Sequence, residues 1–368
     1  MAEPRVTLLV PTLQPRDAVG NDVMGMKECL ERAGYAVTVG AQYVHSEYRK
    51  STLTLTTETT LDAGSPEDIL IYHHAIDWEL GEKILARNRR KLVLKYHNLT
   101  PAHFYAGYSE NYRVACERGR AASVRLAALA GAWIWGDSHY NAGEFLELGA
   151  DPRRTRVIPP FHHIEGLLKS PLDAVVTGAF RSMGPNVLFV GAFRPNKGHA
   201  KALEVFSALL QRTGRPGYLL LVGSLDPALS QYVEDILDYS RRLGVDEFVH
   251  FATSVNSMQL RAFYHVSDVF LCVSEHEGFC VPLAEAMALR VPIVAWRECA
   301  VGETLGDAGI GFETYEPQAI AQAVEDLAVS PLTASAWADR GRLRYEQRFA
   351  PLRIEEKFFE CFREVASQ

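Results

Sequence analysis

The sequence predicts an α/β protein built from two doubly wound domains. Along its 368 residues, short apolar runs typical of buried strands alternate with amphipathic segments of helical length, which is the pattern of parallel sheets assembled from βαβ units. A chain of this length exceeds the size at which a single hydrophobic core usually stops growing, so two domains are expected. The composition agrees: 48% of the residues are hydrophobic and 23% are charged, which suits sizeable cores and excludes a disordered chain.

The first series of strands is expected in the N-terminal half. Its five apolar runs are residues 6–10, 36–39, 69–72, 92–96 and 133–135. Segments 22–33, 113–130 and 138–148 have the periodicity of helices, and Ser138 is placed to cap the last of them. Strands and helices therefore alternate as a doubly wound domain requires.

A second series of strands is expected in the C-terminal half. Its five apolar runs are residues 186–191, 218–222, 248–251, 269–273 and 292–296. The last forty residues have the pattern of helices. Neither series shows the GxGxxG fingerprint after its first strand, so no nicotinamide or flavin cofactor is expected.

The stretch between the two series contains prolines and glycines with little sustained pattern, so we place an interdomain linker there. The expected organisation is an N-terminal domain over residues 1–165, a linker over 166–185, a C-terminal domain over 186–348 and a final helical segment over 349–368.

Charge and cysteine usage narrow the function classes. The net charge of −7 argues against a general nucleic-acid binder, which needs a basic excess. Six scattered cysteines without a CxxC pair predict neither disulfides nor a zinc site. The chain starts without a signal-type leader and has no apolar run of membrane-spanning length, so the cytoplasm is the expected location. Basic clusters at 87–91 and 153–156 are either contacts to anionic lipid, which would make the protein peripheral at a membrane, or solvated surface, the commoner outcome.

Residues 274–287 are the most informative segment, because a glycine turn and a helix start directly follow the apolar run 269–273. Pro282 suits the first helical position, where its missing N–H is not needed. The backbone N–H groups of Gly278, Phe279 and Cys280 would then face the positive end of a helix dipole, an arrangement that suits a phosphate.

Two acids accompany this helix start. Glu277 precedes the helix and Glu285 lies about one turn into it. A carboxylate at the second position can accept both hydroxyls of a ribose. The plainer alternative is that both acids only complement the helix dipole.

A cation pair follows the run 186–191. Arg194 can donate two hydrogen bonds to phosphate oxygens, and Lys197 adds a compact positive charge. Ligands of α/β folds bind at the carboxyl ends of parallel strands. The pair therefore predicts a diphosphate site, although two surface cations in a polar turn are a common alternative.

Candidate residues of the first domain lie at two strand ends. His97 directly follows the run 92–96 and is either a cleft residue or a structural histidine. Gly20 permits close backbone approach, while Asn21 or Asp22 either caps the helix that follows or binds a hydroxyl.

These motifs together resemble the retaining, nucleotide-sugar-dependent glycosyltransferases of family 4, which have the GT-B fold. The similarity is strongest over residues 186–312, which include the RxxK turn and the E-x7-E pattern of Glu277 and Glu285. It implies two Rossmann-like domains facing across a cleft, with the acceptor held mainly by the first and the donor by the second. It also implies that the C-terminal helix crosses back to the first domain.

The resemblance implies roles for individual residues of the second domain. Arg194 and Lys197 match the pyrophosphate-binding pair, Glu285 the ribose ligand, and Glu277 the acid near the hydroxyls of the donor sugar. The remaining donor-binding matches are backbone contacts to sugar and phosphate at Gly278, Phe279 and Cys280, and contacts to the base at Ser254 and Val255.

In the first domain, the resemblance places His97 near the transferred sugar and Gly20 in a loop near the phosphate. The family usually has two glycines in that loop, whereas this chain has Val19-Gly20, which weakens the phosphate assignment.

We therefore expect transfer of a sugar from a UDP- or GDP-sugar to an acceptor hydroxyl with retained anomeric configuration, in glycan, glycolipid or natural-product biosynthesis. No cofactor and no required metal are expected, because side-chain cations neutralise the diphosphate. The alternatives are a nucleotide-sugar epimerase of the same architecture and a catalytically silent nucleotide-sugar-binding protein. The acceptor stays open between a sugar, a lipid-linked molecule and another small molecule.

A set of aromatic residues in the first half forms either a sugar-stacking wall or ordinary surface. Its members are Tyr43, Tyr48, Phe104, Tyr105, Tyr108 and Tyr112.

Overall fold

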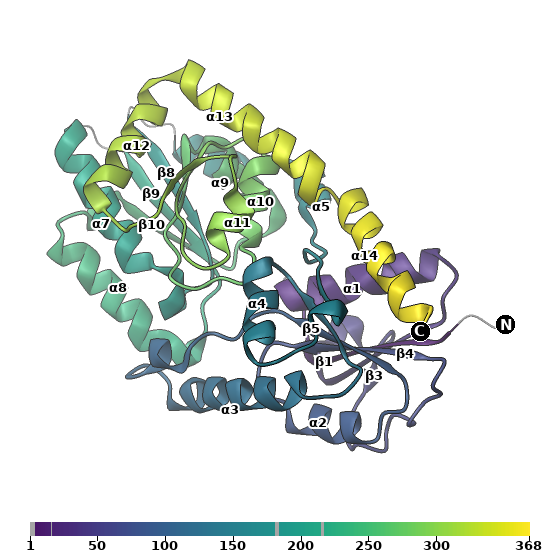
Figure 1. Cartoon of the computed structure of the whole chain (residues 1–368). Coiled ribbons are helices and arrows are strands. Elements are labelled where there is room, and N and C mark those ends of the chain that lie inside the picture. Colours follow the sequence, from purple (N-terminus) through teal and green to yellow (C-terminus); the bar gives the residue numbers. More distant parts are fainter. Residues whose placement is uncertain (1–3, 16, 181–183, 215–216) are drawn as a thin grey trace. The chain divides into compact units, whose positions relative to one another are not determined.

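The computed structural model describes residues 4–15, 17–180, 184–214 and 217–368, and the chain divides into two compact units (Figure 1). Unit 1 comprises residues 1–102, 111–162 and 351–368. Unit 2 comprises residues 103–110 and 163–350. The C-terminal helix therefore belongs to the same unit as the N-terminal strands, and a short segment from the first half belongs to the second unit.

Unit 1 contains a seven-stranded sheet with the order β3-β2-β1-β4-β5-β6-β7, in which every strand pairing is parallel. The strands are β1 (Val6–Leu13), β2 (Val37–Val44), β3 (Leu53–Thr54), β4 (Ile69–His74), β5 (Lys91–Tyr96), β6 (Trp133–Gly136) and β7 (Thr155–Val157). All five predicted strands are present. The two outermost strands were not predicted, because two or three residues show no alternation or apolar run. The order in which successive strands are added to the sheet reverses between β1 and β4, the kind of position where doubly wound sheets bind ligands.

The helices of unit 1 cover both faces of this sheet. They are α1 (Ala18–Arg32), α2 (Glu79–Ala86), α3 (Glu110–Ala127), α4 (His139–Glu147) and α14 (Pro351–Ala366). One apolar cluster joins β1, β2 and β4 to α1 and α14, and a second packs on the other face with residues of α3 and α4. Ser138 caps α4 by accepting a hydrogen bond from the N–H of Asn141 at 3.1 Å, as predicted.

The start of α1 corrects one prediction. The helix begins at Ala18, four residues earlier than its periodicity indicates, and Asp17 is its N-cap. The carboxylate of Asp17 accepts the N–H of Gly20 at 3.0 Å. The proposed cap at Asn21 or Asp22 is therefore wrong, and the carboxylate of Asp22 is free to serve another purpose.

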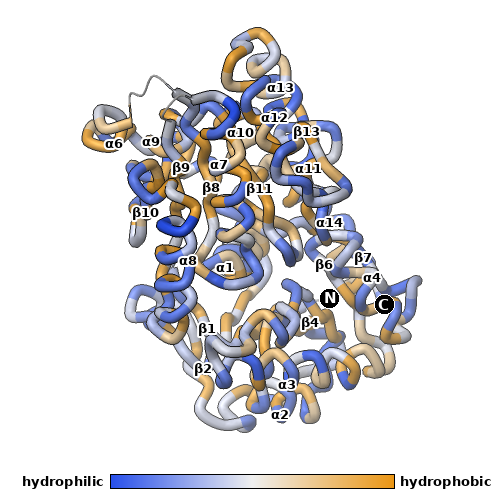
Figure 2. Tube along the Cα trace, turned by 90° about the vertical axis from the view of Figure 1, so that its left-hand side faces the viewer, coloured by the Kyte–Doolittle hydropathy of each residue, from blue (hydrophilic) through white to orange (hydrophobic). Residues whose placement is uncertain are grey.

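Unit 2 contains a six-stranded sheet with the order β10-β9-β8-β11-β12-β13, again with parallel pairings throughout. The strands are β8 (Asn186–Val190), β9 (Tyr218–Gly223), β10 (Val249–Thr253), β11 (Val269–Cys272), β12 (Ile293–Trp296) and β13 (Ile310–Phe312). The five predicted strands are present, and of the strands in the described residues of unit 2 the three-residue β13 was missed. Figure 2 shows the apolar character of the central strands around β8 and β11.

The helices of unit 2 alternate with its strands. They are α5 (Ile164–Lys169), α6 (Ala174–Ala179), α7 (His199–Thr213), α8 (Ser230–Arg242), α9 (Ser257–Val266), α10 (Val281–Ala288), α11 (Val301–Leu305), α12 (Pro317–Val329) and α13 (Pro331–Arg344). The last forty residues are mainly helical, as predicted.

Short 3₁₀ or π turns occur in both units. They are Ser46–Tyr48, Ala102–Tyr105, Pro152–Arg154, Pro195–Lys197, Pro227–Leu229, Asp246–Phe248 and Tyr345–Phe349.

The stretch assigned to a linker contains helical structure. Helices α5 and α6 have six residues each, too few for a sustained period, yet Leu167, Val176 and Phe180 join the apolar core of unit 2. Part of the predicted linker, residues 181–183, lies outside the described residues.

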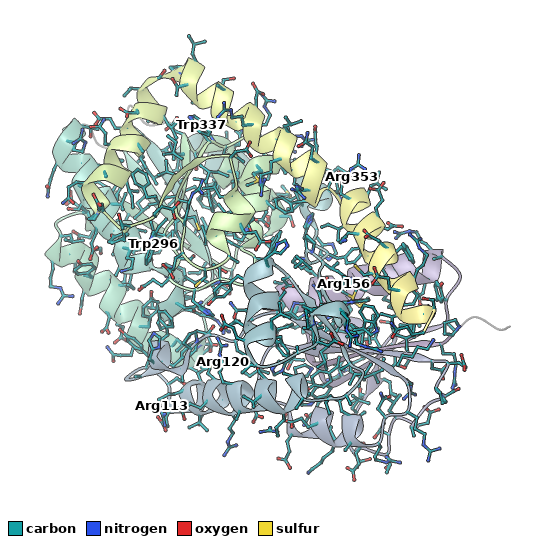
Figure 3. The ribbon with its side chains drawn as sticks, in the orientation of Figure 1. Arg113, Arg120, Arg156, Trp296, Trp337 and Arg353 are labelled. Carbon is teal, nitrogen blue, oxygen red and sulfur yellow. The ribbon has the colours of Figure 1, made fainter. Side chains whose placement is uncertain are left out.

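The basic clusters are engaged within unit 1. Arg156 is labelled in Figure 3. Its guanidinium contacts Glu364 of α14, with Nε 3.0 Å from the carboxylate, and lies over the ring of Trp133. Arg87 donates to the carbonyl of Glu58 at 2.6 Å, and Lys91 donates to that of Ala366 at 2.7 Å. These contacts agree with the plainer interpretation, that the clusters belong to the protein's own surface.

All six cysteines lie in the described part of the chain, where none of them forms a disulfide and five are buried. Within the described ranges, every helix is too short or too polar to cross a lipid bilayer.

Candidate functional site

The cation turn follows β8 in unit 2 and packs directly against the end of β11. Gly198 closes the turn with a left-handed backbone at φ +79°, and a Cβ at this position would lie 2.1 Å from the carbonyl oxygen of Val273. Only glycine tolerates both conditions. The turn that carries Lys197 is thereby placed beside the acidic segment that follows β11.

The central contact of this site joins Lys197 to Glu277. The ammonium nitrogen lies 2.9 Å from each of the two carboxylate oxygens. Burial lowers the pKa of Lys197, but the charge and hydrogen bonds of Glu277 outweigh it, so the pKa is raised above its ordinary value. The Glu277 side chain is only 10% exposed, so this ion pair is shielded and weakly screened by salt.

Glu285 is held separately, by a tyrosine. It lies on α10, and its carboxylate accepts a hydrogen bond from the hydroxyl of Tyr264 at 2.8 Å. Burial raises the pKa of Glu285, while the hydrogen bond from Tyr264 opposes that shift. Tyr264 is 1% exposed, so it fixes the carboxylate from below the surface.

Arg194 lies on the β9 side of the cation turn. Its guanidinium is 3.7 Å from the carboxylate of Asp226, and 38% of the side chain is exposed. Asp226 also accepts the N–H of Ala228 at 3.0 Å, which fixes the acid at the start of a 3₁₀ turn. The two predicted phosphate ligands therefore have different internal partners.

Helix α10 starts one residue earlier than the sequence predicts. Cys280 is the N-cap in a left-handed backbone at φ +71°, and Val281 rather than Pro282 is the first helical residue. The hydroxyl of Thr304 donates to the carbonyl of Phe279 at 2.6 Å. Among the residues that the structure describes, none accepts a hydrogen bond from the N–H groups of Gly278, Phe279 or Cys280.

Ser254 and Val255 follow β10, and Ser254 has a left-handed backbone at φ +57°. Because β8, β10 and β11 run parallel in one sheet, their carboxyl ends share one edge. That edge carries Arg194, Lys197 and Glu277 as well as the predicted base-contacting pair.

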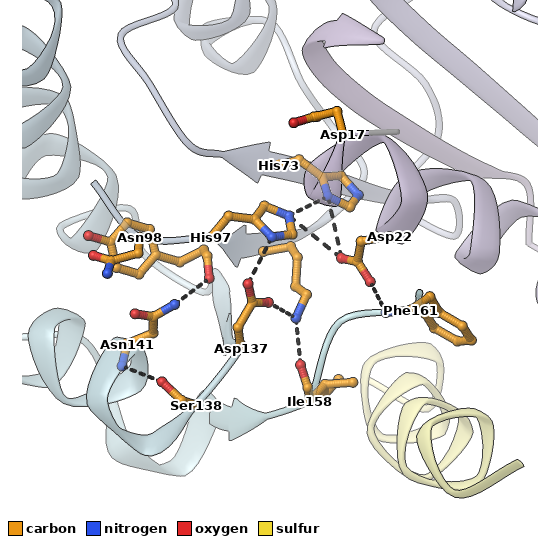
Figure 4. A network of polar contacts seen from close by, with 12 residues as sticks. Asp17, Asp22, His73, His97, Asn98, Asp137, Ser138, Asn141, Ile158 and Phe161 are labelled. Carbon is orange, nitrogen blue, oxygen red and sulfur yellow. Dashed lines mark hydrogen bonds and ion pairs between the residues drawn. The ribbon is translucent and has the colours of Figure 1, made fainter. Parts of the chain in front are cut away.

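In unit 1, His97 follows β5 and is the centre of a buried polar network (Figure 4). Its Nδ1 lies 3.0 Å from the carboxylate of Asp137, and its Nε2 lies 2.8 Å from Nδ1 of His73. Lys95 donates to Asp137 and, at 2.6 Å, to the carbonyl of Ile158. Both ring nitrogens of His97 are thus engaged inside unit 1.

Asp22 completes the network from α1. One carboxylate oxygen accepts the N–H of Phe161 at 2.7 Å, and the other lies 3.6 Å from Nε2 of His97 without a hydrogen bond to any described residue. Burial raises the pKa of Asp22 to about 6. Burial also raises the pKa of Asp137, but His97 and Lys95 overcome it and hold that pKa below its ordinary value.

Asp22, His73 and His97 bring one oxygen and two ring nitrogens within 4.8 Å of one another, which are donor types of a metal site. The two imidazole rings differ in plane by 9° with centroids 5.1 Å apart, so they meet nitrogen to nitrogen. That is the geometry of an N–H···N hydrogen bond. Burial lowers the pKa of His73 well below its ordinary value, so the His73 ring is neutral.

Gly20 lies in the first turn of α1 and is needed there for space. A Cβ would lie 2.7 Å from the carbonyl oxygen of Gln14. The N–H of Gly20 donates its hydrogen bond to Asp17. The backbone group that the resemblance assigns to the phosphate therefore already has a partner.

The aromatic set divides. Tyr43 is 63% exposed and Tyr105 is buried. Phe104 and Tyr108, in the segment of unit 2 that begins at residue 103, contact His276 and Tyr232 with ring centroids 6.3 and 5.3 Å apart. Phe104 therefore lies beside the neighbour of Glu277.

Two parallel sheets with helices on both faces form two Rossmann-like domains, and the predicted GT-B fold is confirmed by its agreement with solved glycosyltransferases. The chain superimposes on Anabaena HepE in complex with UDP and glucose with a TM-score of 0.76, covering 98% of this chain and 100% of that one at 16% identity. This similarity establishes the fold of the chain.

Sequence comparison identifies a domain within unit 2. Residues 177–344 match the family described as Glycosyl transferases group 1. The chain is 26% identical over 251 residues to a GDP-mannose:cellobiosyl-diphosphopolyprenol alpha-mannosyltransferase of Xanthomonas oryzae, covering 67% of this chain and 61% of the relative. It is 28% identical over 148 residues to a lipopolysaccharide 1,2-N-acetylglucosaminetransferase of Salmonella typhimurium, covering 38% of each. The chain thus matches less than two thirds of the length of these relatives.

Proposed function

We propose that the protein is a retaining glycosyltransferase of family 4, which transfers a sugar from a nucleoside diphosphate sugar to an acceptor hydroxyl. The observation that carries this proposal is the contact between Lys197 and Glu277. A cation beside a carboxylate at the carboxyl edge of a parallel sheet suits a ligand that has both phosphate groups and sugar hydroxyls. The match of this domain to glycosyl transferases supports it.

The diphosphate leaving group is the part of the reaction that unit 2 stabilises. As the bond between the anomeric carbon and the phosphate oxygen breaks, its electrons remain on the diphosphate. Arg194, Lys197 and the N–H groups at the start of α10 are fixed positive groups that stabilise this charge and lower the barrier. These side chains are why we propose no required metal at the diphosphate.

Glu285 and Glu277 bind opposite ends of the donor in this proposal. Glu285, held by Tyr264, accepts the ribose hydroxyls, and Glu277 accepts hydroxyls of the transferred sugar. Ser254 and Val255 contact the base. Retention follows if the acceptor oxygen attacks the oxocarbenium-like carbon on the face from which the diphosphate leaves, and the leaving oxygen takes the acceptor proton.

In this proposal His97 lies near the transferred sugar. Because both nitrogens are bonded to Asp137 and His73, contact of a nitrogen with the sugar requires the bond to His73 to be exchanged.

The acceptor class follows from the relatives. The names of two relatives specify a cellobiosyl-diphosphopolyprenol and a lipopolysaccharide, so we propose a sugar-containing acceptor, lipid-linked or free. A lipid-linked acceptor would bring the protein to the cytoplasmic face of a membrane as a peripheral enzyme.

The test is a donor screen followed by product analysis. Purified protein is heated with UDP-glucose, UDP-N-acetylglucosamine, GDP-mannose, and ADP- and dTDP-sugars, and a rise in melting temperature identifies the donor. That donor is then incubated with sugar and polyprenol-linked sugar acceptors. A glycoside with the donor's anomeric configuration supports the proposal. An altered nucleotide sugar without glycoside indicates an epimerase, and binding without turnover indicates a silent binding protein.

A further inference from the structure

Asn196 lies between the two predicted phosphate ligands, and it connects the cation turn to the acidic segment. Its side-chain Nδ2 donates to the carbonyl oxygen of His276 at 3.0 Å. Its own backbone carbonyl accepts the N–H groups of Glu275 at 2.9 Å and His276 at 3.2 Å. One residue therefore makes three hydrogen bonds to the two residues that precede Glu277.

Burial makes these bonds persistent. Asn196 is 3% exposed and His276 is 5% exposed, so water has little access to replace a lost partner. A buried carbonyl left without its donor is unfavourable. On the other side of Lys197, Gly198 lies so close to Val273 that a Cβ there would be 2.1 Å from the carbonyl oxygen of Val273.

We propose that Asn196 is a positioning residue of the donor site, which sets the carboxylate of Glu277 against the ammonium of Lys197. This inference rests on the proposed function. Asn196 does not touch the donor: it acts by fixing the segment 275–277 on the turn 194–197. The bidentate contact, with both oxygens at 2.9 Å, is the geometry that the asparagine maintains.

Loss of this positioning is expected to lower the rate of sugar transfer more than the affinity for the nucleoside diphosphate. Lys197, which binds the diphosphate in this proposal, lies on the turn 194–197 itself, so its position does not depend on the side chain of Asn196. Glu277 binds the transferred sugar, and its segment depends on Asn196 for its register. A displacement of about 1 Å at such a group lowers the rate by about 100-fold. Loss of the asparagine therefore lowers kcat for the intact nucleotide sugar more than it weakens binding of the free nucleoside diphosphate.

The chain offers a matched control at the other end of β8. Asn186 is also 3% exposed, and its Nδ2 donates to the carbonyls of Phe180 and Val266, both at 2.8 Å. Asn186→Ala removes a buried asparagine amide of the same kind from the same unit, at the amino end of the strand, away from the carboxyl edge. It reports what general loss of stability does to activity.

The experiment compares Asn196→Ala, Asn196→Asp and Asn186→Ala, with folding followed by circular dichroism. The aspartate has the shape of asparagine but presents an oxygen to the His276 carbonyl, so it tests the hydrogen bond even if the alanine variant folds poorly. We expect both changes at Asn196 to lower kcat by about 10- to 100-fold, with KM and the dissociation constants for UDP and GDP within about threefold of wild type, and Asn186→Ala to leave kcat unchanged.

A double-mutant cycle separates positioning from stability. If Asn196 acts through Glu277, then Asn196→Ala has at most a twofold further effect on kcat in a Glu277→Gln background. Asn186→Ala gives the same ratio in both backgrounds. An undiminished effect of Asn196→Ala beside Glu277→Gln, or equal losses from the two asparagine changes, would overturn the inference while leaving the proposed function intact. Wild-type protein that binds neither UDP nor GDP and turns over no nucleotide sugar would overturn both.

Discussion

The ammonium of Lys197 lies 2.9 Å from each carboxylate oxygen of Glu277, so the residue expected to bind a diphosphate already holds an internal anion. An incoming phosphate must share Lys197 with this carboxylate or replace it. The same carboxylate is the group expected to accept hydroxyls of the transferred sugar. Binding of the leaving group and binding of the sugar are therefore coupled through one ion pair.

Glu277→Gln is predicted to separate these two roles. Removing the negative charge frees Lys197, so the affinity for the nucleoside diphosphate rises by about 3- to 10-fold. The transfer rate falls by about 100-fold because the sugar loses a charged acceptor. Calorimetric titration with UDP and GDP measures the first effect, and initial rates measure the second. Weaker diphosphate binding combined with an unchanged rate would contradict this division of roles.

Lys197→Ala is predicted to abolish turnover and to lower the stability of unit 2. The substitution leaves Glu277, 10% exposed, without its charge partner. An unpaired buried group of this kind costs about 1–3 kcal/mol. Urea unfolding measures the loss of stability. Adding Glu277→Gln should restore part of it without restoring turnover, and a double variant no more stable than Lys197→Ala would show that the ion pair is not the cause.

Tyr264→Phe is predicted to weaken the ribose contact in a pH-dependent manner. The hydroxyl of Tyr264 stabilises the ionised form of Glu285, while burial raises its pKa. Without the hydroxyl that pKa rises further, so the carboxylate is protonated at a higher pH. Donor affinity should then fall as the pH is lowered, beginning at a higher pH than in wild type, with a loss of about 10-fold. Titrations from pH 8 to pH 5 give the comparison, and identical pH profiles for the two proteins would refute the coupling.

Asp22→Asn is predicted to stabilise unit 1 near neutral pH. The pKa of Asp22 is raised from 3.8 to about 6, so the folded state holds this proton more firmly than the unfolded state. Its contribution to stability is therefore greatest below pH 4 and is lost as the pH rises through 6. Asparagine retains the oxygen that accepts the N–H of Phe161 and removes the buried charge.

The melting temperature of Asp22→Asn should accordingly exceed that of wild type at pH 7.5, by about 2–4 °C for each kcal/mol gained, and the difference should shrink by pH 4.5. Scanning calorimetry across this range provides the check. A variant less stable than wild type at every pH would mean that the ionised carboxylate supports the network.

The sequence alone predicted the strands that lie in the interior of each sheet. Five apolar runs in each half became strands, because burial on both faces imposes a continuous hydrophobic run. The edge strands β3, β7 and β13 have two or three residues, too few to leave a pattern. Helices α5 and α6 escaped notice for the same reason, since six residues complete fewer than two helical turns.

The candidate site was predictable as residues but not as contacts. Lys197 and Glu277 were each recognised from local motifs, yet nothing local indicates that side chains 80 positions apart meet. Tyr264 supports Glu285, and Asn196 supports the acidic segment, through pairings that only the folded sheet creates. For His97, its place after a strand was visible, whereas its engagement with His73 and Asp137 depends on the alignment of three parallel strands.

The most direct test of the central claim is calorimetric titration of wild-type protein and Lys197→Ala with UDP and GDP. The proposed donor site predicts that wild type binds one of these nucleotides and that the alanine variant, folded by circular dichroism, binds it at least 100-fold more weakly. Equal affinities for the two proteins, or no binding of either nucleotide to wild type, would contradict it.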